Sequence, residues 1–277
     1  MRTSIEGDRP KISIIMGIYN CEETLGEAID SILNQTYKNW QLIMCDDGSK
    51  DKTYRIAEQY KQVYPNKIIL LKNSNNMRLA STLNRCLEYA DGDYIARMDG
   101  DDISLPTRLE KQIEYLEKHK ECDLIGTAMI SFDEEGDKGV VDVCENPTKD
   151  MLRFGSPFCH ATIVARKKVY DTLKGYRISK EIRRCEDVDL WFRFYAAGFK
   201  GANLREPLYR VREDREAFKR RSFSHGIDAA RVSLHGYKML NYPWYSYVLL
   251  LKPIIASALP GWFMKKYHNV KNQRRKG

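Results

Sequence analysis

The sequence predicts an α/β fold, with a mainly parallel mixed sheet flanked by helices. Over about the first 130 residues, short apolar runs alternate with segments whose apolar residues recur every three or four positions. Two acidic turns, Asp46–Ser49 and Asp99–Asp102, each follow directly after one of these apolar runs. Because open α/β sheets bind ligands beyond the carboxyl ends of their strands, we expect both turns at one site.

Each expected element has its own signal in the sequence. Continuous apolar runs are typical of strands buried on both faces, and helices carry apolar residues on one side only. The expected strands are Ile12–Ile18, Trp40–Cys45, Ile68–Leu71 and Tyr94–Met98. Helices are expected from about Glu22, at Thr53–Tyr64, around Leu79–Leu87 and after Pro106, a residue that suits the first turn of a helix. Past Asp123 the pattern is mixed, with strands near Leu124–Ser131 and Ala161–Ala165 and a helix near Glu186–Ala197.

Composition and charge narrow the class of protein. With 277 residues, 43% of them apolar, the chain can bury a sizeable core. After Asp228 there are nine basic residues and no acidic one, so most of the net charge of +8 lies in the tail. A nucleic-acid-binding protein more often spreads basic residues over its folded surface, so no nucleic-acid partner is expected. The seven cysteines form no CxxC pair, which is typical of reduced thiols.

The C-terminal segment is expected to bind an anionic membrane surface. Its apolar runs, Met239–Leu251 and Pro253–Met264, are both shorter than the ~20 residues that span a bilayer. Aromatic residues accompany them, and a basic stretch, Lys265–Lys276, follows. The alternative is a helical pair that packs on the protein itself or on a second copy. Met1–Pro10 lacks the apolar segment of a signal peptide, so we expect a cytoplasmic protein, peripheral on the inner face of the cell membrane.

The Asp99-Gly100-Asp101 tripeptide is a candidate metal site. Mg²⁺ and Mn²⁺ prefer oxygen ligands, and they commonly join carboxylates to the phosphates of a substrate. Gly100 allows a close backbone approach to a diphosphate. The alternative is a solvated turn before the next helix. The position after a buried strand, with a second acidic strand end upstream, favours the metal site.

At this point five short motifs, in order, resemble the family 2 glycosyltransferases, which have the GT-A fold. They are Ile12-Ser13-Ile14-Ile15 with Tyr19-Asn20, then Ser31–Thr36, then Asp46-Asp47-Gly48-Ser49, then Gly92–Ile95, then Asp99-Gly100-Asp101-Asp102. The resemblance is specific over 12–102 and weaker to about Tyr209. It does not clearly cover the last 50 or so residues. Gly17 departs from it, since the family often has proline there.

The resemblance implies roles in binding a nucleoside-diphosphate sugar. Tyr19 would stack on the base, and Asp47 would accept a hydrogen bond from a base ring nitrogen, which suits UDP. Asp101 would be the direct ligand of Mn²⁺ or Mg²⁺, and Asp99 would contact the ribose or assist the metal. Arg78 would face the diphosphate, although an ordinary exposed arginine is an equal alternative. The implied donor-binding set is Tyr19, Asn20, Asp47, Arg78, Asp99 and Gly100.

Glu186-Asp187 supplies the second group of carboxylates. A single displacement at the anomeric carbon inverts configuration and needs a base for the proton of the attacking hydroxyl. Asp187 resembles the family's base, although acidic residues also stabilise a helix start. Glu186 and His160 are assigned to the acceptor or sugar pocket. For His160 a structural role is an equal alternative. Trp191 is expected in the core.

The sequence therefore predicts an inverting, metal-dependent glycosyltransferase that modifies a cell-surface polysaccharide or a lipid-linked glycan precursor. Residues 1–215 would form the catalytic domain, with a nucleotide-binding part at 11–102 and an acceptor part at 103–215. Residues 216–277 would form the helical extension. One alternative is a catalytically silent scaffold on the membrane surface. Another is a nucleotide-dependent oxidoreductase, although no GxGxxG follows the first strand.

Overall fold

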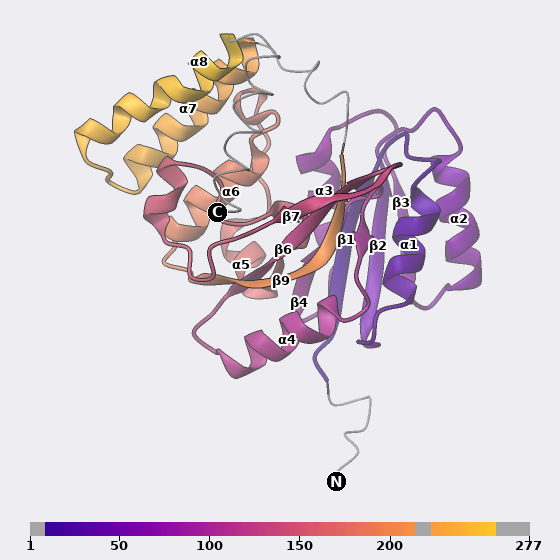
Figure 1. Cartoon of the computed structure of the whole chain (residues 1–277). Coiled ribbons are helices and arrows are strands. Elements are labelled where there is room, and N and C mark those ends of the chain that lie inside the picture. The colour runs from indigo at the N-terminus through magenta and orange to yellow at the C-terminus, as the bar shows by residue number, and fades with distance from the viewer. Residues whose placement is uncertain (1–8, 214–222, 259–277) are drawn as a thin grey trace.

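The computed structural model describes residues 9–213 and 223–258 and contains one mixed β-sheet (Figure 1). In the described residues the strand order is β3-β2-β1-β4-β8-β6-β9-β5, and β7 pairs with β6. The first four strands of this order are parallel, and β8 runs antiparallel to both of its neighbours. The strands are β1 Ile12–Ile18, β2 Trp40–Asp46, β3 Ile68–Lys72, β4 Tyr94–Arg97, β5 Ile103–Ser104, β6 Leu124–Asp133, β7 Gly136–Val141, β8 Val164–Arg166 and β9 Gly201–Arg212.

Helices cover both faces of the sheet and create two hydrophobic cores. On one face, alternate residues of β1 pack against α1, α2 and α4. On the other face, the remaining residues of β1 and β2 pack against α3, α5 and α6. This is the burial expected for parallel strands that are apolar along their whole length. The helices are α1 Leu25–Leu33, α2 Thr53–Val63, α3 Leu79–Leu87, α4 Arg108–Lys118, α5 Lys167–Leu173, α6 Glu186–Ala196, α7 Phe223–Met239 and α8 Leu251–Ala258.

The expected elements are found within a few residues of their predicted bounds, with one exception. The strand expected near Ala161–Ala165 is wrong in its first half, because His160–Thr162 is a 3₁₀ turn and β8 begins at Val164. That turn is buried: the Thr162 hydroxyl donates to the carbonyl of Cys159 and accepts the backbone N–H of Thr127. The prediction failed because a run of buried residues in the sequence does not distinguish a buried turn from a buried strand.

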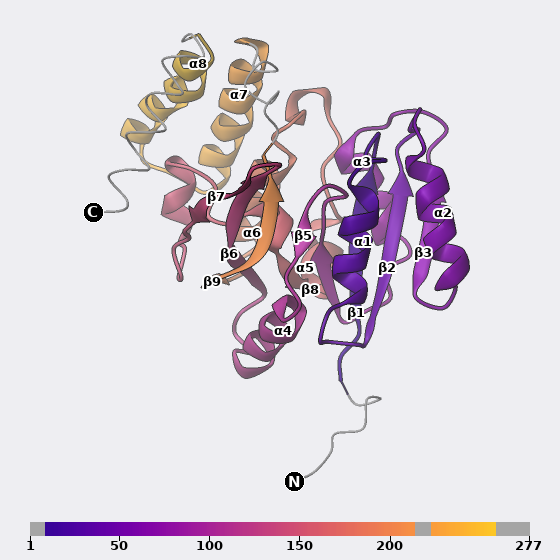
Figure 2. The same cartoon turned by 45° about the vertical axis from the view of Figure 1, so that its right-hand side comes forward.

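The C-terminal helices lie at the opposite end of the molecule from α2 (Figures 1 and 2). α7 packs against α6, where the rings of Phe192 and Tyr237 meet edge to face at 6.0 Å. Tyr237, Leu240 and Tyr242 belong to the same core as the sheet. In the two ranges that the structure describes, no helix is both long and apolar enough to span a bilayer. The domain boundary expected at residue 216 falls outside the described residues.

The contact between α6 and α7 depends on Gly236. A Cβ at this position would lie 2.2 Å from the ring of Phe192, which is 1% exposed. We predict that Gly236→Ala destabilises the protein by about 1–3 kcal/mol through overpacking, measured by urea unfolding. In a helix that did not pack here, the same change would stabilise by about 1 kcal/mol. Gly155→Ala is the control, because nothing lies within 4 Å of its Cβ. A stabilised Gly236→Ala would contradict the packing.

Candidate active site

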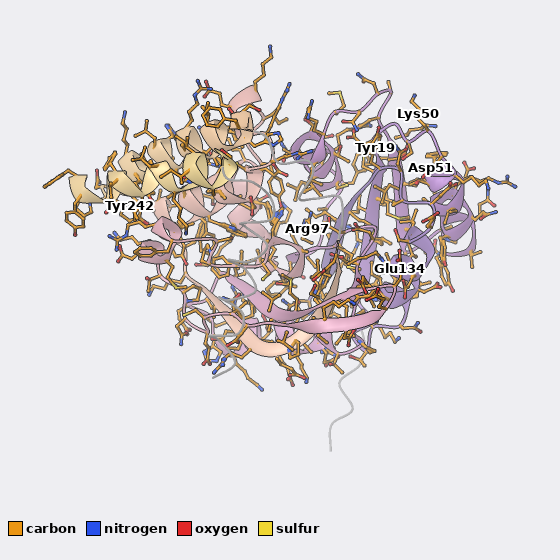
Figure 3. All side chains as sticks on the ribbon, turned by 45° about the horizontal axis from the view of Figure 1, so that its top comes forward. Tyr19, Lys50, Asp51, Arg97, Glu134 and Tyr242 are labelled. Atoms are coloured by element: carbon orange, nitrogen blue, oxygen red, sulfur yellow. The ribbon has the colours of Figure 1, made fainter. Side chains whose placement is uncertain are left out.

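The turns after β1, β2 and β4 meet at one cavity of about 520 Å³. Tyr19 and Asn20 line it from the β1 turn, and Asp101 lines it from the β4 turn. Tyr19 is 46% exposed, so its ring face is free to contact a ligand. In Figure 3 it lies beside Lys50 and Asp51 of the following turn. Three of the residues that the sequence assigned to the donor and metal site therefore share this cavity.

Asn20 holds the β1 turn against the β2 turn. Its backbone N–H donates to the Ser49 hydroxyl at 3.0 Å, and its side-chain oxygen accepts the backbone N–H of Lys50 at 2.9 Å. The φ of Asn20 is 47°, a left-handed conformation that asparagine tolerates better than most residues. Asn20 therefore shapes the cavity through its backbone contacts.

Asp47 organises the segment that leads into α3. Its carboxylate accepts the backbone N–H groups of Met77 and Arg78 at 2.7 and 2.8 Å, and the amide of Asn73 at 2.7 Å. Arg78 has a φ of 73°, which these bonds stabilise. The two carboxylate oxygens of Asp47 can accept about four hydrogen bonds, so capacity for one from a nucleotide base is left. Arg78 does not line the Tyr19 cavity but a second one, together with Glu186.

The residues after β4 form an acidic cluster that suits a divalent cation. Asp99, Asp101 and Asp102 each offer a carboxylate oxygen, and the three oxygens lie within 4.8 Å of one another. Burial and the neighbouring Asp99 carboxylate raise the pKa of Asp101. Burial and both neighbours raise the pKa of Asp102 to about 7. Crowded carboxylates with raised pKa values are stabilised by a cation among them, and an all-oxygen ligand set suits Mn²⁺ or Mg²⁺.

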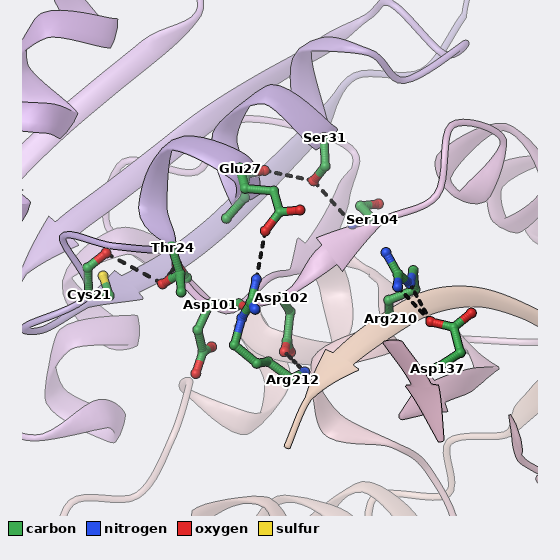
Figure 4. Close-up of polar contacts among 12 residues, drawn as sticks. Cys21, Thr24, Glu27, Ser31, Asp101, Asp102, Ser104, Asp137, Arg210 and Arg212 are labelled. Carbon is green, nitrogen blue, oxygen red and sulfur yellow. Dashed lines mark hydrogen bonds and ion pairs between the residues drawn. The ribbon is translucent and has the colours of Figure 1, made fainter. Parts of the chain in front are cut away.

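The cluster is held by residues that the sequence did not single out. Figure 4 shows Arg212, at the end of β9, between Glu27 and the cluster. Its backbone N–H donates to Asp102 at 2.8 Å, and its guanidinium donates to the Asp101 carbonyl at 3.0 Å and to Glu27 at 2.6 Å. The Tyr209 hydroxyl accepts the backbone N–H of Asp99 at 3.2 Å. β9 therefore fixes the cluster from a segment that is about 110 residues away in sequence.

Gly100 is needed for packing at the floor of the site. A Cβ on Gly100 would lie 3.1 Å from Cys21 Sγ and from Ile18 Cγ2. Its carbonyl accepts the Thr24 hydroxyl at 3.1 Å. The missing side chain therefore admits residues of the β1 turn, and the close approach of Gly100 to a diphosphate stays a prediction.

Arg97 is a charged residue that the sequence analysis missed. It ends β4, is 3% exposed, and forms an ion pair with Asp99. Burial opposes its charge, but the Asp99 carboxylate outweighs that effect, so the pKa of Arg97 is raised. Burial raises the pKa of Asp101, Glu186 and Asp187, and the positive charge of Arg97 offsets part of that rise. Arg97 is thus an electrostatic neighbour of both carboxylate groups, which are far apart in sequence. In the sequence, the one indication of its role was that a basic residue stands within an apolar run.

Glu186 and Asp187 form the first turn of α6. Trp191 is fully buried further along this helix, as expected for a core residue. Burial raises the pKa of Asp187, and burial also raises that of Glu186, in spite of Arg97 nearby. An acidic group with a raised pKa is a better proton acceptor than an ordinary exposed aspartate. Asp187 at the start of α6 therefore has the raised pKa expected of a base, and that role stays a prediction.

His160 begins the 3₁₀ turn His160–Thr162, near enough to Arg97 for the charge of that arginine to act on the ring. Its Nε2 lies 2.8 Å from the Tyr176 hydroxyl, and its ring packs edge-on to Trp191 at 5.9 Å. Burial and the charge of Arg97 lower the pKa of His160, so the ring is neutral at neutral pH. These contacts fit the structural alternative, and the role in the sugar pocket stays a prediction.

Comparisons with known sequences agree on one family. The model described as Glycosyl transferase family 2 matches residues 13–173. The putative glycosyltransferase EpsE of Bacillus subtilis is 52% identical over 267 residues, 96% of this chain and 96% of the relative. The UDP-Glc:alpha-D-GlcNAc-diphosphoundecaprenol beta-1,3-glucosyltransferase WfaP of Escherichia coli is 31% identical over 202 residues, 72% of this chain and 77% of the relative.

Solved structures match the fold at low identity. S. aureus TarS in complex with UDP-GlcNAc gives a TM-score of 0.67 at 16% identity, over 89% of this chain and 81% of that one. The mannosyltransferase PcManGT from Pyrobaculum calidifontis, in complex with GDP-Man and Mn²⁺, gives 0.59 at 16% identity, over 96% and 81%. The oxidoreductase alternative is therefore wrong. The chain belongs to glycosyl transferase family 2 and is a glycosyltransferase with the expected GT-A fold.

Proposed function

We propose that the protein is an inverting, metal-dependent enzyme that transfers a sugar from a UDP-sugar to a hydroxyl of a polysaccharide or lipid-linked glycan precursor. The observation that carries the proposal is the cluster of Asp99, Asp101 and Asp102 after β4, of which Asp101 lines the same cavity as the exposed Tyr19. The names of two relatives support the donor and acceptor classes: one of Erwinia amylovora is an amylovoran biosynthesis glycosyltransferase, and the one of Escherichia coli is named for UDP-Glc and a sugar on diphosphoundecaprenol.

The donor would lie in the cavity lined by Tyr19. Its base would stack on the exposed Tyr19 ring. Asp47 is buried and does not line this cavity, and it would accept a hydrogen bond from the base with its remaining acceptor capacity. Asp101 and Asp99 would hold Mn²⁺ or Mg²⁺, with Asp102 beside them. When bound, such a cation stabilises the negative charge that develops on the departing diphosphate.

Asp187 would act on the acceptor. The acceptor hydroxyl oxygen forms the new bond to the anomeric carbon while the bond to the diphosphate breaks, and the nucleoside diphosphate leaves with the electron pair. Asp187 takes the hydroxyl proton in this step. Attack on the face opposite the leaving group inverts the anomeric configuration. The scaffold alternative differs from this in one respect: it would bind the nucleotide and turn nothing over.

The first test replaces the base. We predict that Asp187→Asn lowers turnover by about 10²–10⁴-fold and leaves UDP affinity unchanged, because only proton removal is lost. In the native enzyme, activity falls as pH falls through the raised pKa of Asp187, so its acid limb lies above the ~3.9 of an ordinary aspartate. Turnover is measured with a panel of UDP-sugars. Full activity in Asp187→Asn would move the base elsewhere, and a native protein that binds UDP without turnover would support the scaffold.

The second test concerns the metal. We predict that calorimetry detects UDP binding in Mn²⁺ and that EDTA abolishes it. Asp101→Asn is expected to weaken the Mn²⁺-dependent part of binding by about tenfold or more, because a ligand to the cation is lost. Glu114→Gln, which changes an exposed carboxylate on α4, is the control. Equal UDP affinity with and without the metal would refute metal dependence.

We further propose that the C-terminal segment binds an anionic membrane surface. Trp244, Val248 and Ile255 are 85%, 66% and 55% exposed, and Leu251 is 52% exposed among them. Exposed apolar and aromatic side chains of this kind insert into the interface of a bilayer. The sequence that follows, Lys265–Lys276, is basic and lies outside the described residues. Together they would place the enzyme on the inner membrane face as a peripheral protein.

The membrane proposal predicts flotation with vesicles. Trp244→Ser with Val248→Ser should reduce the fraction of protein that floats with phosphatidylglycerol vesicles by about tenfold, since the two most exposed of these apolar side chains are lost. Val63→Ser on α2 is the control, because Val63 is equally exposed at 68%. Truncation at residue 238 is a poor test, because it also removes the buried Leu240 and Tyr242. Unchanged vesicle binding in the double variant would leave the segment without this role.

A further inference from the structure

A second cavity, of about 520 Å³, lies between the start of α3 and the segment 177–186. We propose that it binds the diphosphate and the first isoprenoid units of an acceptor glycan that is carried on a lipid diphosphate. The inference rests on the proposed function, and it narrows the acceptor to one chemical class. Five basic side chains and one carboxylate, Glu186, line the cavity. The basic side chains are Arg78, Arg177, Lys180, Arg183 and Arg184.

The positive charge of the cavity is only partly compensated by the protein. Arg177 pairs with the buried Asp189 at 2.7 Å, so its charge is used within the fold. Within the ranges described, no carboxylate forms an ion pair with Arg78, Lys180 or Arg183, which are all exposed. Several uncompensated cations around one cavity indicate an anionic ligand, and phosphate groups suit arginine well.

The same cavity also has an apolar lining. Met77 and Ile178 are 49% and 64% exposed there, and Leu79 and Ile182 lie below them. Exposed apolar side chains beside free cations fit a ligand with both a charged group and a hydrocarbon chain. A nucleotide or a free sugar has no hydrocarbon chain that would occupy the apolar lining. The cavity also differs from the one that Tyr19, Asn20 and Asp101 line.

The position of Glu186 connects this cavity to the chemistry. Glu186 lines the cavity, and Asp187 is the next residue in the same turn of α6. In a glycosyl diphosphate lipid, the phosphate and the attacking hydroxyl are on one sugar ring. A diphosphate held by Arg183 and Lys180 would therefore leave the hydroxyl near Asp187. A relative in Escherichia coli is named for an acceptor of this class, a sugar on diphosphoundecaprenol.

Farnesyl diphosphate is a probe of this site that does not depend on the identity of the acceptor sugar. Calorimetry on the full chain, with UDP and Mn²⁺ in excess to fill the donor site, is expected to detect its binding. Farnesol and inorganic diphosphate are expected to bind at least tenfold more weakly, because each lacks one half of the recognised group. Displacement of farnesyl diphosphate by UDP and Mn²⁺ would overturn the proposal, since the probe would then occupy the donor site.

Charge reversal locates the binding. Lys180→Glu with Arg183→Glu is expected to weaken farnesyl diphosphate binding by about tenfold or more and to leave UDP binding and UDP-sugar hydrolysis unchanged. Arg55→Glu, a charge reversal at an exposed position of α2, is the matched control. Equal affinity for the probe in the double variant would refute the site. A failure of UDP binding in the native chain would instead refute the proposed function, so the two failures are distinguishable.

Discussion

The buried ion pair between Arg97 and Asp99 is the interaction on which the site depends. A guanidinium that is 3% exposed is costly unless a carboxylate compensates it, and Asp99 is the carboxylate that does so. Breaking such a pair leaves an uncompensated charge in the core, at a cost of about 3–5 kcal/mol. The Nε of Arg97 has no hydrogen-bond partner within the described residues, so the ion pair with Asp99 is the main compensation of this buried charge.

The surrounding fold fixes the position of Arg97 at the end of β4. Arg108 of α4 donates to the Arg97 carbonyl at 2.8 Å and so holds the end of β4 from below. The charge of Arg97 offsets part of the rise in pKa that burial causes at Asp101 and at Asp187. The carboxylates after β4 suit the binding of a divalent cation, and those at the start of α6 suit the uptake of a proton. Arg97 therefore interacts favourably with the negative charge of both groups, although Asp101 and Glu186 line different cavities.

The sequence allowed the nucleotide-binding half to be predicted closely, because local patterns determine it. The strands Ile12–Ile18 and Tyr94–Arg97 are short apolar runs, and the acidic turns that follow them are local motifs. Arg97 and Arg212 could not be assigned, because their roles arise from contacts with Asp99 and Glu27, which only the folded chain brings near. For His160, the single residue gave no sign of its contact with Tyr176. The roles of the site residues stay predictions that the experiments above test.

For the C-terminal segment, membrane binding and packing on the protein itself need not exclude each other. Tyr237, Leu240 and Tyr242 are buried in the core of the sheet, whereas Trp244, Val248 and Ile255 face outward. The same apolar pattern in the sequence therefore contains side chains that pack in the core and side chains that are free to bind a partner. Exposing an apolar surface to water is unfavourable, so such a surface indicates a binding partner. The close contact of Gly236 with Phe192 holds α7 on α6 and so gives the exposed side chains that follow a fixed orientation. Membrane binding through Trp244, Val248 and Ile255 would then orient the catalytic body, because the neighbouring Leu240 and Tyr242 are packed in its core.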